Sequence, residues 1–116
     1  MTDDFSPASD STNTATRELA EVPAVEVVTT VAVHLMSAAA IKCGLADDQS
    51  EDDVPAQQDL AEARILITAL AGLVNSSAPY LGTSHAGPLR DGLKSLQAAF
   101  REASPLPDPV GQGPGE

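Results

Sequence analysis

The sequence has few of the residues that build most binding and catalytic sites. Its 116 positions hold one cysteine, no tryptophan, two histidines and six lysine and arginine residues. The single cysteine, Cys43, cannot form an internal disulfide. With 17 acids the net charge is −11, and so acidic a surface repels the phosphates of nucleic acids and of anionic lipids. The composition therefore argues against direct binding to nucleic acid or to a membrane surface.

Recognisable catalytic and ligand motifs are lacking as well. The sequence has no GxSxG turn, no glycine-rich phosphate loop and no CxxC pair. Neither His34 nor His85 has a second ligand at the i+3 or i+4 spacing of metal-binding helices. We therefore expect no enzyme, no cofactor and no metal. The main alternative is a small-ligand or metal-binding protein that uses His34, His85 and a pocket between helices, and a small enzyme comes third.

The negative charge is concentrated outside the apolar segments. Residues 1–15, residues 46–59 (the acidic loop 46–58 and Asp59) and residues 105–116 hold 11 acids and no base, so the rest of the chain is neutral in sum. The first segment is polar and the last is rich in proline and glycine, which predicts a disordered tail at each end. The N-terminal residues also lack the bases and the apolar run of a signal peptide, so we expect a cytoplasmic protein.

The longest apolar stretch, residues 25–45, is VEVVTTVAVHLMSAAAIKCGL. Only 15 residues separate Glu26 from Lys42, whereas a bilayer span needs about 20 mostly apolar residues. The β-branched first half would suit a strand, but apolar residues recur at helical spacing from Val25 to Cys43. With Gly44 as its C-cap, the stretch predicts a helix over about 23–43.

Two further helices are predicted. The second, about 60–77, begins at Asp59 as N-cap with Glu62 three residues on, and Pro79 is expected to stop or kink it. The third, about 88–103, carries Leu89, Leu93, Leu96 and Phe100 on one face opposite charged residues. The prediction is an all-α, small three-helix bundle over 16–104, an antiparallel helical hairpin plus a third amphipathic helix, with disordered tails.

The first two predicted helices carry more apolar surface than a lone three-helix bundle can bury. An exposed apolar patch of this size is unusual on a soluble monomer, so we predict a homo-oligomer, most simply a dimer. The alternative is that the long loops fold over the patch. The candidate interface residues are Val27, Val31, Leu35, Ala39, Ile65, Ala69 and Gly72. The one basic strip, on the third helix, is a candidate docking site for an acidic partner and comprises Arg90, Lys94 and Arg101.

Three segments in order resemble a known family. They are EVPAVEVVTTVAVHLMSAAAIKCGL, DLAEARILITALAGL and HAGPLRDGLKSLQAAFREAS, followed by GQGPGE. Together they resemble the bacterial domain of unknown function eighteen forty-four, in its actinobacterial form, over about residues 20–104. The resemblance implies a helical cytoplasmic protein with no established activity, whose genes often lie beside translation initiation factor three. It implies a link to translation, in which an acidic protein would meet a basic protein partner rather than bare RNA.

Overall fold

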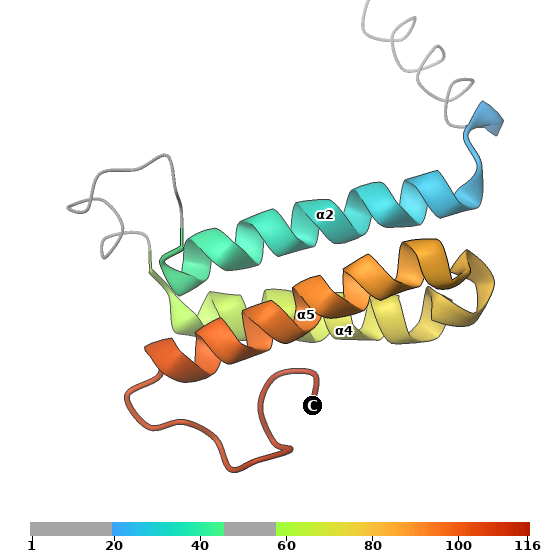
Figure 1. The fold of residues 1–116 in the computed structure, drawn as a ribbon. Coiled ribbons are helices and arrows are strands. Elements are labelled where there is room, and N and C mark those ends of the chain that lie inside the picture. Colours follow the sequence, from blue (N-terminus) through green and yellow to red (C-terminus); the bar gives the residue numbers. More distant parts are fainter. Residues whose placement is uncertain (1–19, 46–57) are drawn as a thin grey trace, which may run out of the picture.

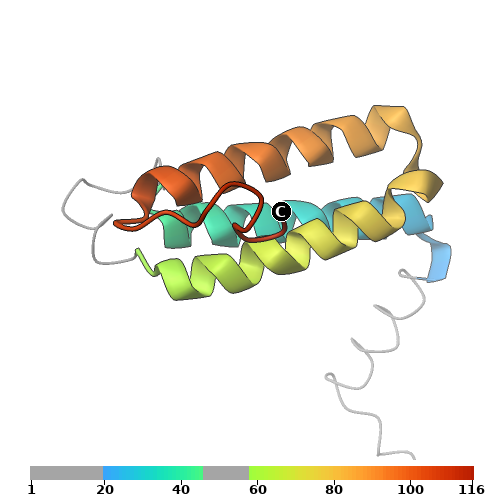
Figure 2. The same cartoon turned by 90° about the horizontal axis from the view of Figure 1, so that it is seen from below.

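A computed structural model describes residues 20–45 and 58–116, and within them the chain forms three helices (Figure 1). These are α2 (Ala24–Cys43), α4 (Leu60–Leu81) and α5 (Thr83–Ala103). Successive helices run in opposite directions, so that α2 and α5 point the same way with α4 antiparallel to both (Figures 1 and 2). The described part of the chain has no strand, which confirms the prediction of an all-α three-helix bundle. The expected tail 1–15 and most of the acidic loop lie outside the described residues.

The ends of α2 follow the sequence signals closely. Pro23 precedes the first turn, where its missing N–H leaves no helical hydrogen bond unmade. At the other end Gly44 has φ 89°, the left-handed conformation that glycine adopts most readily. The N–H groups of Gly44 and Leu45 then donate to the carbonyls of Ile41 and Ala40 at 3.0 and 2.8 Å. This turn satisfies carbonyls that the last helical turn would leave without partners.

The second helix begins as predicted but runs further. The Asp59 carboxylate accepts a hydrogen bond from the Glu62 N–H at 3.1 Å, which is the expected N-cap. The expectation that Pro79 stops the helix is wrong, because α4 continues through Pro79 to Leu81. A proline there removes one hydrogen bond, to the carbonyl of Asn75. Both residues are exposed, so water can satisfy that carbonyl at little cost.

The third helix likewise begins before its predicted start. It opens at Thr83 and contains Pro88, which was expected to begin it. Gly82, with φ 81° and ψ 157°, turns the chain between α4 and α5, and its carbonyl accepts hydrogen bonds from the His85 and Ala86 N–H groups. Pro88 is exposed, as is Ser84, whose carbonyl lacks the usual partner. The exposed position again makes an internal proline tolerable.

The core lies along the axis of the bundle and matches the predicted apolar stripes. Each helix contributes a buried row: Ala32, Ala39 and Cys43 from α2, Ala63, Ile67, Leu70, Ala71 and Val74 from α4, and Leu89, Leu93, Leu96 and Phe100 from α5. The small residues of α2 let the helices approach closely, and Met36 of α2 reaches the position of Gly92 on α5. No polar or charged residue of the described chain is buried.

The C-terminal segment differs from its prediction. Residues 105–116 were expected to be an extended, mobile tail, whereas the structure folds them back across α4 and α5 (Figures 1 and 2). Pro114 is buried there, and side chains of both helices bind the segment. Composition correctly excludes helix and strand in this segment, but it does not exclude a defined irregular conformation held by long-range contacts.

By length and composition, α2 is the one described helix that could cross a bilayer. The core helix of a soluble protein passes the same test, and α2 packs against both α4 and α5 with Ala32 and Ala39 fully buried between them. Only 11% of its most apolar window is buried, so α2 packs on the bundle along one side and leaves most of its surface exposed.

Candidate interaction surfaces

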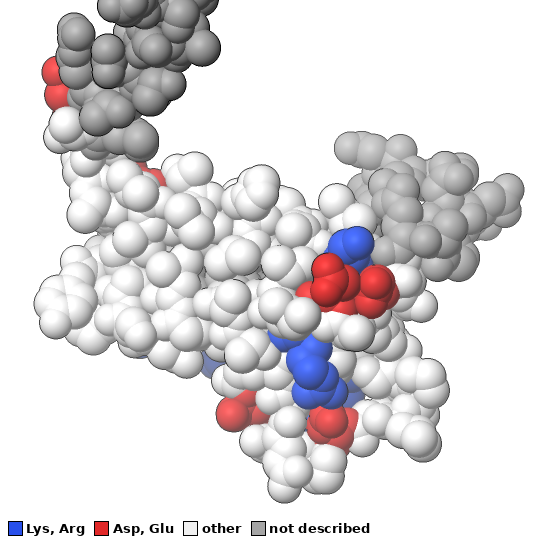
Figure 3. Space-filling view, turned by 180° about the vertical axis from the view of Figure 1, so that it is seen from behind, with Lys and Arg blue, Asp and Glu red and all other residues white. Residues whose placement is uncertain are grey.

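The first candidate surface is the outer side of α2 and α4. No charged residue occurs between Glu26 and Lys42 or between Arg64 and Arg90. Figure 3 shows the consequence: most charged side chains gather near the end where α2 stops and α4 begins and along the lower edge, and further acidic atoms show at the start of α2. The middle of this side is free of them. We call this area the uncharged face. The exposed large apolar side chains of α2 and α4 are Val27, Val31, Val33, Ile41, Ile65 and Tyr80. Val33 lies about 160° around α2 from Val31 and therefore outside the uncharged face.

The structure places the predicted interface residues in three environments. Val27, Val31, Ile65, Ala69 and Gly72 are exposed, as expected of residues that could meet a second chain, and Ile65 is 62% exposed. Leu35 is half-buried and packs against the core.

Ala39 needs correction, because it is fully buried inside the bundle and cannot lie at a surface contact. The stripe that contains it is the core-facing side of α2. The side of α2 that faces solvent is offset from this stripe by about half a helical turn.

A shallow hollow lies on the uncharged face. It has a volume of about 450 Å³ and is lined by Val22, Glu26, Val27, Thr30 and Val31. Its lining is mainly aliphatic, and its only charged group is the Glu26 carboxylate. A hollow of this kind suits the apolar side chain of a facing protein better than a polar metabolite, which would need several fixed hydrogen-bonding groups.

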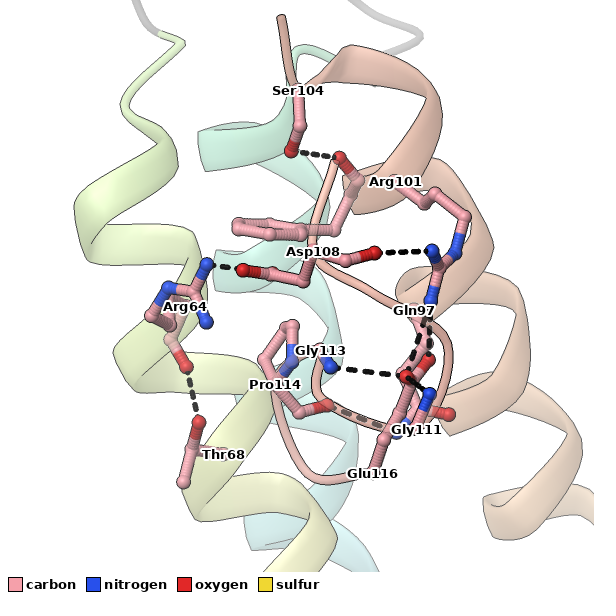
Figure 4. A network of polar contacts seen from close by, with 11 residues as sticks. Arg64, Thr68, Gln97, Arg101, Ser104, Asp108, Gly111, Gly113, Pro114 and Glu116 are labelled. Carbon is pink, nitrogen blue, oxygen red and sulfur yellow. Dashed lines mark hydrogen bonds and ion pairs between the residues drawn. The ribbon is translucent and has the colours of Figure 1, made fainter. Parts of the chain in front are cut away.

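The second candidate surface is where the C-terminal segment meets α4 and α5, and we call it the tail clasp (Figure 4). Arg64 of α4 donates to the Asp108 carboxylate at 2.8 Å, and its guanidinium lies 5.1 Å from the centre of the Phe100 ring. Arg101 of α5 donates to the Asp108 carbonyl at 2.8 Å and to the Glu116 carboxylate at 3.1 Å. Two arginines from different helices thus hold two acids of one segment.

The backbone of the segment is bound as closely as its acids. Gln97 donates to the carbonyl of Pro114 at 3.0 Å, next to the buried ring of that proline. Gly115 has φ 76°, and a Cβ added to it would come within 2.4 Å of the Ala71 Cβ. Only glycine fits this approach to α4 without a rearrangement.

The Glu116 carboxylate organises the end of the segment. Its Oε1 accepts hydrogen bonds from the N–H groups of Gly113 and Gly111 at 3.0 and 3.1 Å. The Gly113 N–H is the main cause that lowers the pKa of Glu116 below its usual value, helped by Arg101 and the Gly111 N–H against an opposing effect of desolvation. The charged carboxylate is therefore the form that holds the turn.

The predicted basic strip is divided by the clasp. Arg90 and Lys94 are exposed on α5, and neither takes part in an ion pair within the described residues. Arg101 is bound to residues 108 and 116 instead. Arg101 was predicted to bind an acidic partner, and the acidic groups that it binds in this structure belong to its own chain. Arg64 was not predicted to take part, because nothing in the sequence pairs it with Asp108, 44 positions away.

No feature of the described chain favours a metal or redox site. His34 and His85 are both exposed, and neither lines the hollow on α2 or the hollow of about 340 Å³ beside the clasp. The residues that the structure describes contain no cluster of three potential metal ligands. Burial raises the pKa of the Cys43 thiol, which is 3% exposed, so the reactive thiolate is disfavoured.

Of three comparisons with known proteins, one finds a match. A search of curated proteins finds no match, and a search of solved structures finds none either. The model of one protein family, described as Domain of unknown function (DUF1844), matches residues 24–102. The matched region runs from the first turn of α2 to the last turn of α5 and so covers the whole bundle. The chain therefore belongs to the DUF1844 family.

Proposed function

We propose that this protein is a non-enzymatic, cytoplasmic interaction module that works as a homodimer through the uncharged face. The observation that carries the proposal is the exposure of large apolar side chains on a face without charges, with Val31 46% and Ile65 62% exposed. Burying apolar area on association is favourable at about 25 cal/mol per Å² before the entropic costs of binding are subtracted.

A second copy is the simplest occupant of this face. The face is uncharged over most of α2 and α4, so two copies meet there without bringing like charges together or stripping water from ions. A twofold dimer also pairs the same patch with itself, which one sequence can satisfy without a specialised partner. The small exposed residues Ala69 and Gly72 would allow a close approach of helices.

The proposed outside partner is a basic protein of the translation machinery. The support is the net charge of −11 and the 11 acids of residues 1–15, 46–59 and 105–116, which would attract a basic protein over long range. Dimerisation doubles the charge that the partner meets. The uncharged face would then serve assembly, while the acidic segments would serve recognition.

Sedimentation velocity over a range of protein concentrations tests the dimer. We expect a mass near twice 11.9 kDa at micromolar concentration. Val31→Glu should shift the protein to the monomer, because the dimer interface would then bury one unpaired carboxylate from each chain. Ser95→Glu, at an exposed position on α5, is the matched control and should leave the mass unchanged. A wild-type chain that stays monomeric at 100 micromolar, or a Val31→Glu chain that stays dimeric with native helicity, contradicts the proposal.

A further inference from the structure

The tail clasp has the contact pattern of a bound peptide. Residues 104–116 are irregular, and α4 and α5 hold them through Arg64, Gln97 and Arg101. The contacts reach a carboxylate, two peptide carbonyls, a buried proline and a glycine packed on Ala71. Recognition of a backbone together with selected side chains is typical of bound peptide segments.

The bundle does not depend on this segment for its core. The buried apolar side chains of the core cluster lie in α2, α4 and α5, and the cluster includes none from residues 104–116. The two large apolar side chains of the segment, Leu106 and Val110, are 91% and 92% exposed. The segment is thus attached by polar contacts, one proline and one glycine, and it leaves Leu106 and Val110 in solvent.

These contacts also make the attachment readily reversible. The arginine side chains of the two ion pairs are 45% and 36% exposed, so water and salt compete for both pairs. The segment stays bound because it is tethered to α5, which gives it an effective concentration in the millimolar range. A partner segment that makes the same contacts and adds apolar ones would displace it.

We propose that the clasp surface of Arg64, Ala71, Gln97 and Arg101 is a docking site for an extended, acidic, proline- and glycine-containing segment of a partner protein. Residues 105–116 are the intramolecular competitor for this site. The partner segment needs a carboxylate for Arg64, a carbonyl and a carboxylate for Arg101, and a glycine over Ala71. This surface is distinct from the uncharged face, so the chain can dimerise and bind the segment together.

The hollow beside the clasp explains what a partner could add. It has a volume of about 340 Å³ between the start of α4 and the end of α5, and its lining includes Leu60, Phe100 and Leu106. The chain's own Leu106 lies at its edge and remains almost fully exposed. Displacement of residues 105–116 removes Pro105 and Leu106 from this lining and leaves Leu60, Ala61 and Phe100 of the helices. An apolar side chain of the partner that packs on these residues would gain burial that Leu106 does not obtain.

The experiment uses a fluorescent peptide of residues 105–116, PLPDPVGQGPGE, and a full-length protein in which Gly115→Val weakens the docking of its own segment. The added side chain would meet Ala71, so the intramolecular segment opens while the helices keep their sequence. Fluorescence anisotropy should show that the peptide binds this variant about tenfold more tightly than the wild-type chain, because the competitor is removed. Glu116→Gln, which removes a carboxylate bound by Arg101, is the second opening variant and should act in the same direction.

Three controls decide the result. Adding Arg101→Ala to the opened chain should abolish peptide binding, whereas Arg90→Ala, an exposed arginine on the same helix, should leave it unchanged. A peptide with Asp108→Asn should bind more weakly than the native peptide. Equal affinity of wild-type and opened chains, no binding to either, or equal losses from the two arginine variants would overturn the proposal. If the peptide dissociates a wild-type oligomer, the clasp surface binds residues 105–116 of a second copy. This outcome would also overturn the proposal.

Discussion

At the scale of single residues, two isoleucines on α4 separate the roles of its two sides. Ile67 is fully buried and packs in the core, and Ile65 is 62% exposed on the uncharged face. Ile67→Ala should lower the free energy of unfolding by about 3 kcal/mol, because it removes buried methylene groups and leaves a cavity. Ile65→Ala should lower it by about 0.5 kcal/mol or less in dilute solution. Urea unfolding followed by circular dichroism at low protein concentration measures both.

Equal losses at the two positions would mean that the sides of α4 are wrongly assigned. The sequence predicts the assignment of Ile67 well, because Ala63, Ile67, Leu70 and Val74 recur at helical spacing and all four are buried. It predicts Ala39 poorly as a surface residue. On α2 both sides are apolar, so spacing identifies a helix but does not distinguish the core side from the solvent side.

At the scale of elements, the turn between α4 and α5 depends on one glycine. Gly82 has φ 81° and ψ 157°, a conformation open almost exclusively to glycine, and no atom lies within 4 Å of a Cβ built on it. Gly82→Ala should therefore destabilise the bundle by about 2 kcal/mol through backbone strain alone. Gly72, inside α4, also has open space around it but is helical, so Gly72→Ala should stabilise by about 0.5 to 1 kcal/mol.

Thermal unfolding of the two variants at one protein concentration, low enough to keep the chain monomeric, gives shifts of opposite sign if this account is right. Two downward shifts, or two upward shifts, would contradict it. The same turn explains why the helix boundaries were predicted less well than the helices themselves. Pro79 and Pro88 suggest breaks, but each occupies an exposed helical position, and the actual break lies at Gly82 between them.

At the scale of the whole molecule, the docking of the C-terminal segment should depend on pH. The pKa of Glu116 is lowered by the N–H of Gly113, by Arg101 and by the N–H of Gly111, so the charged carboxylate favours the docked state. A carboxyl group whose pKa is lowered in the docked state stabilises docking fully at pH values above its free pKa, near 4.5. This stabilisation is lost as the pH falls through the pKa of the docked state. The arginines stay charged throughout, and Asp108 faces Arg64 in the same network.

NMR spectra recorded from pH 7 to pH 3 check this expectation. The Gly111 and Gly113 amide signals should move toward those of Glu116→Gln as the carboxylate is protonated, while the signals of Ile67 in the core stay in place. Glu102→Gln, on α5 and exposed, should not alter the transition. Glycine signals that stay constant down to pH 3 would show that the carboxylate does not hold the segment.

The clasp is the part of the molecule that the sequence could not predict. The bundle follows from apolar spacing, caps and glycine positions, all of which are local signals. Docking of residues 105–116 depends on pairs such as Arg64 with Asp108 and Ala71 with Gly115, which are far apart in the chain and have no spacing rule. A proline- and glycine-rich composition excludes regular structure, and the long-range partners then decide whether the segment is ordered.

The junction between α2 and α4 has a consequence for engineering the chain. The Asp59 N–H donates to the Lys42 carbonyl at 2.8 Å, and the Gln58 amide donates to the Cys43 carbonyl at 3.2 Å. These bonds join the two ends of the connection directly, so the pairing of the helices does not rely on the length of the chain between them. Doubling that length should cost only about 0.6 kcal/mol in closure entropy. A short affinity tag inserted there should therefore leave the pairing of α2 with α4 intact.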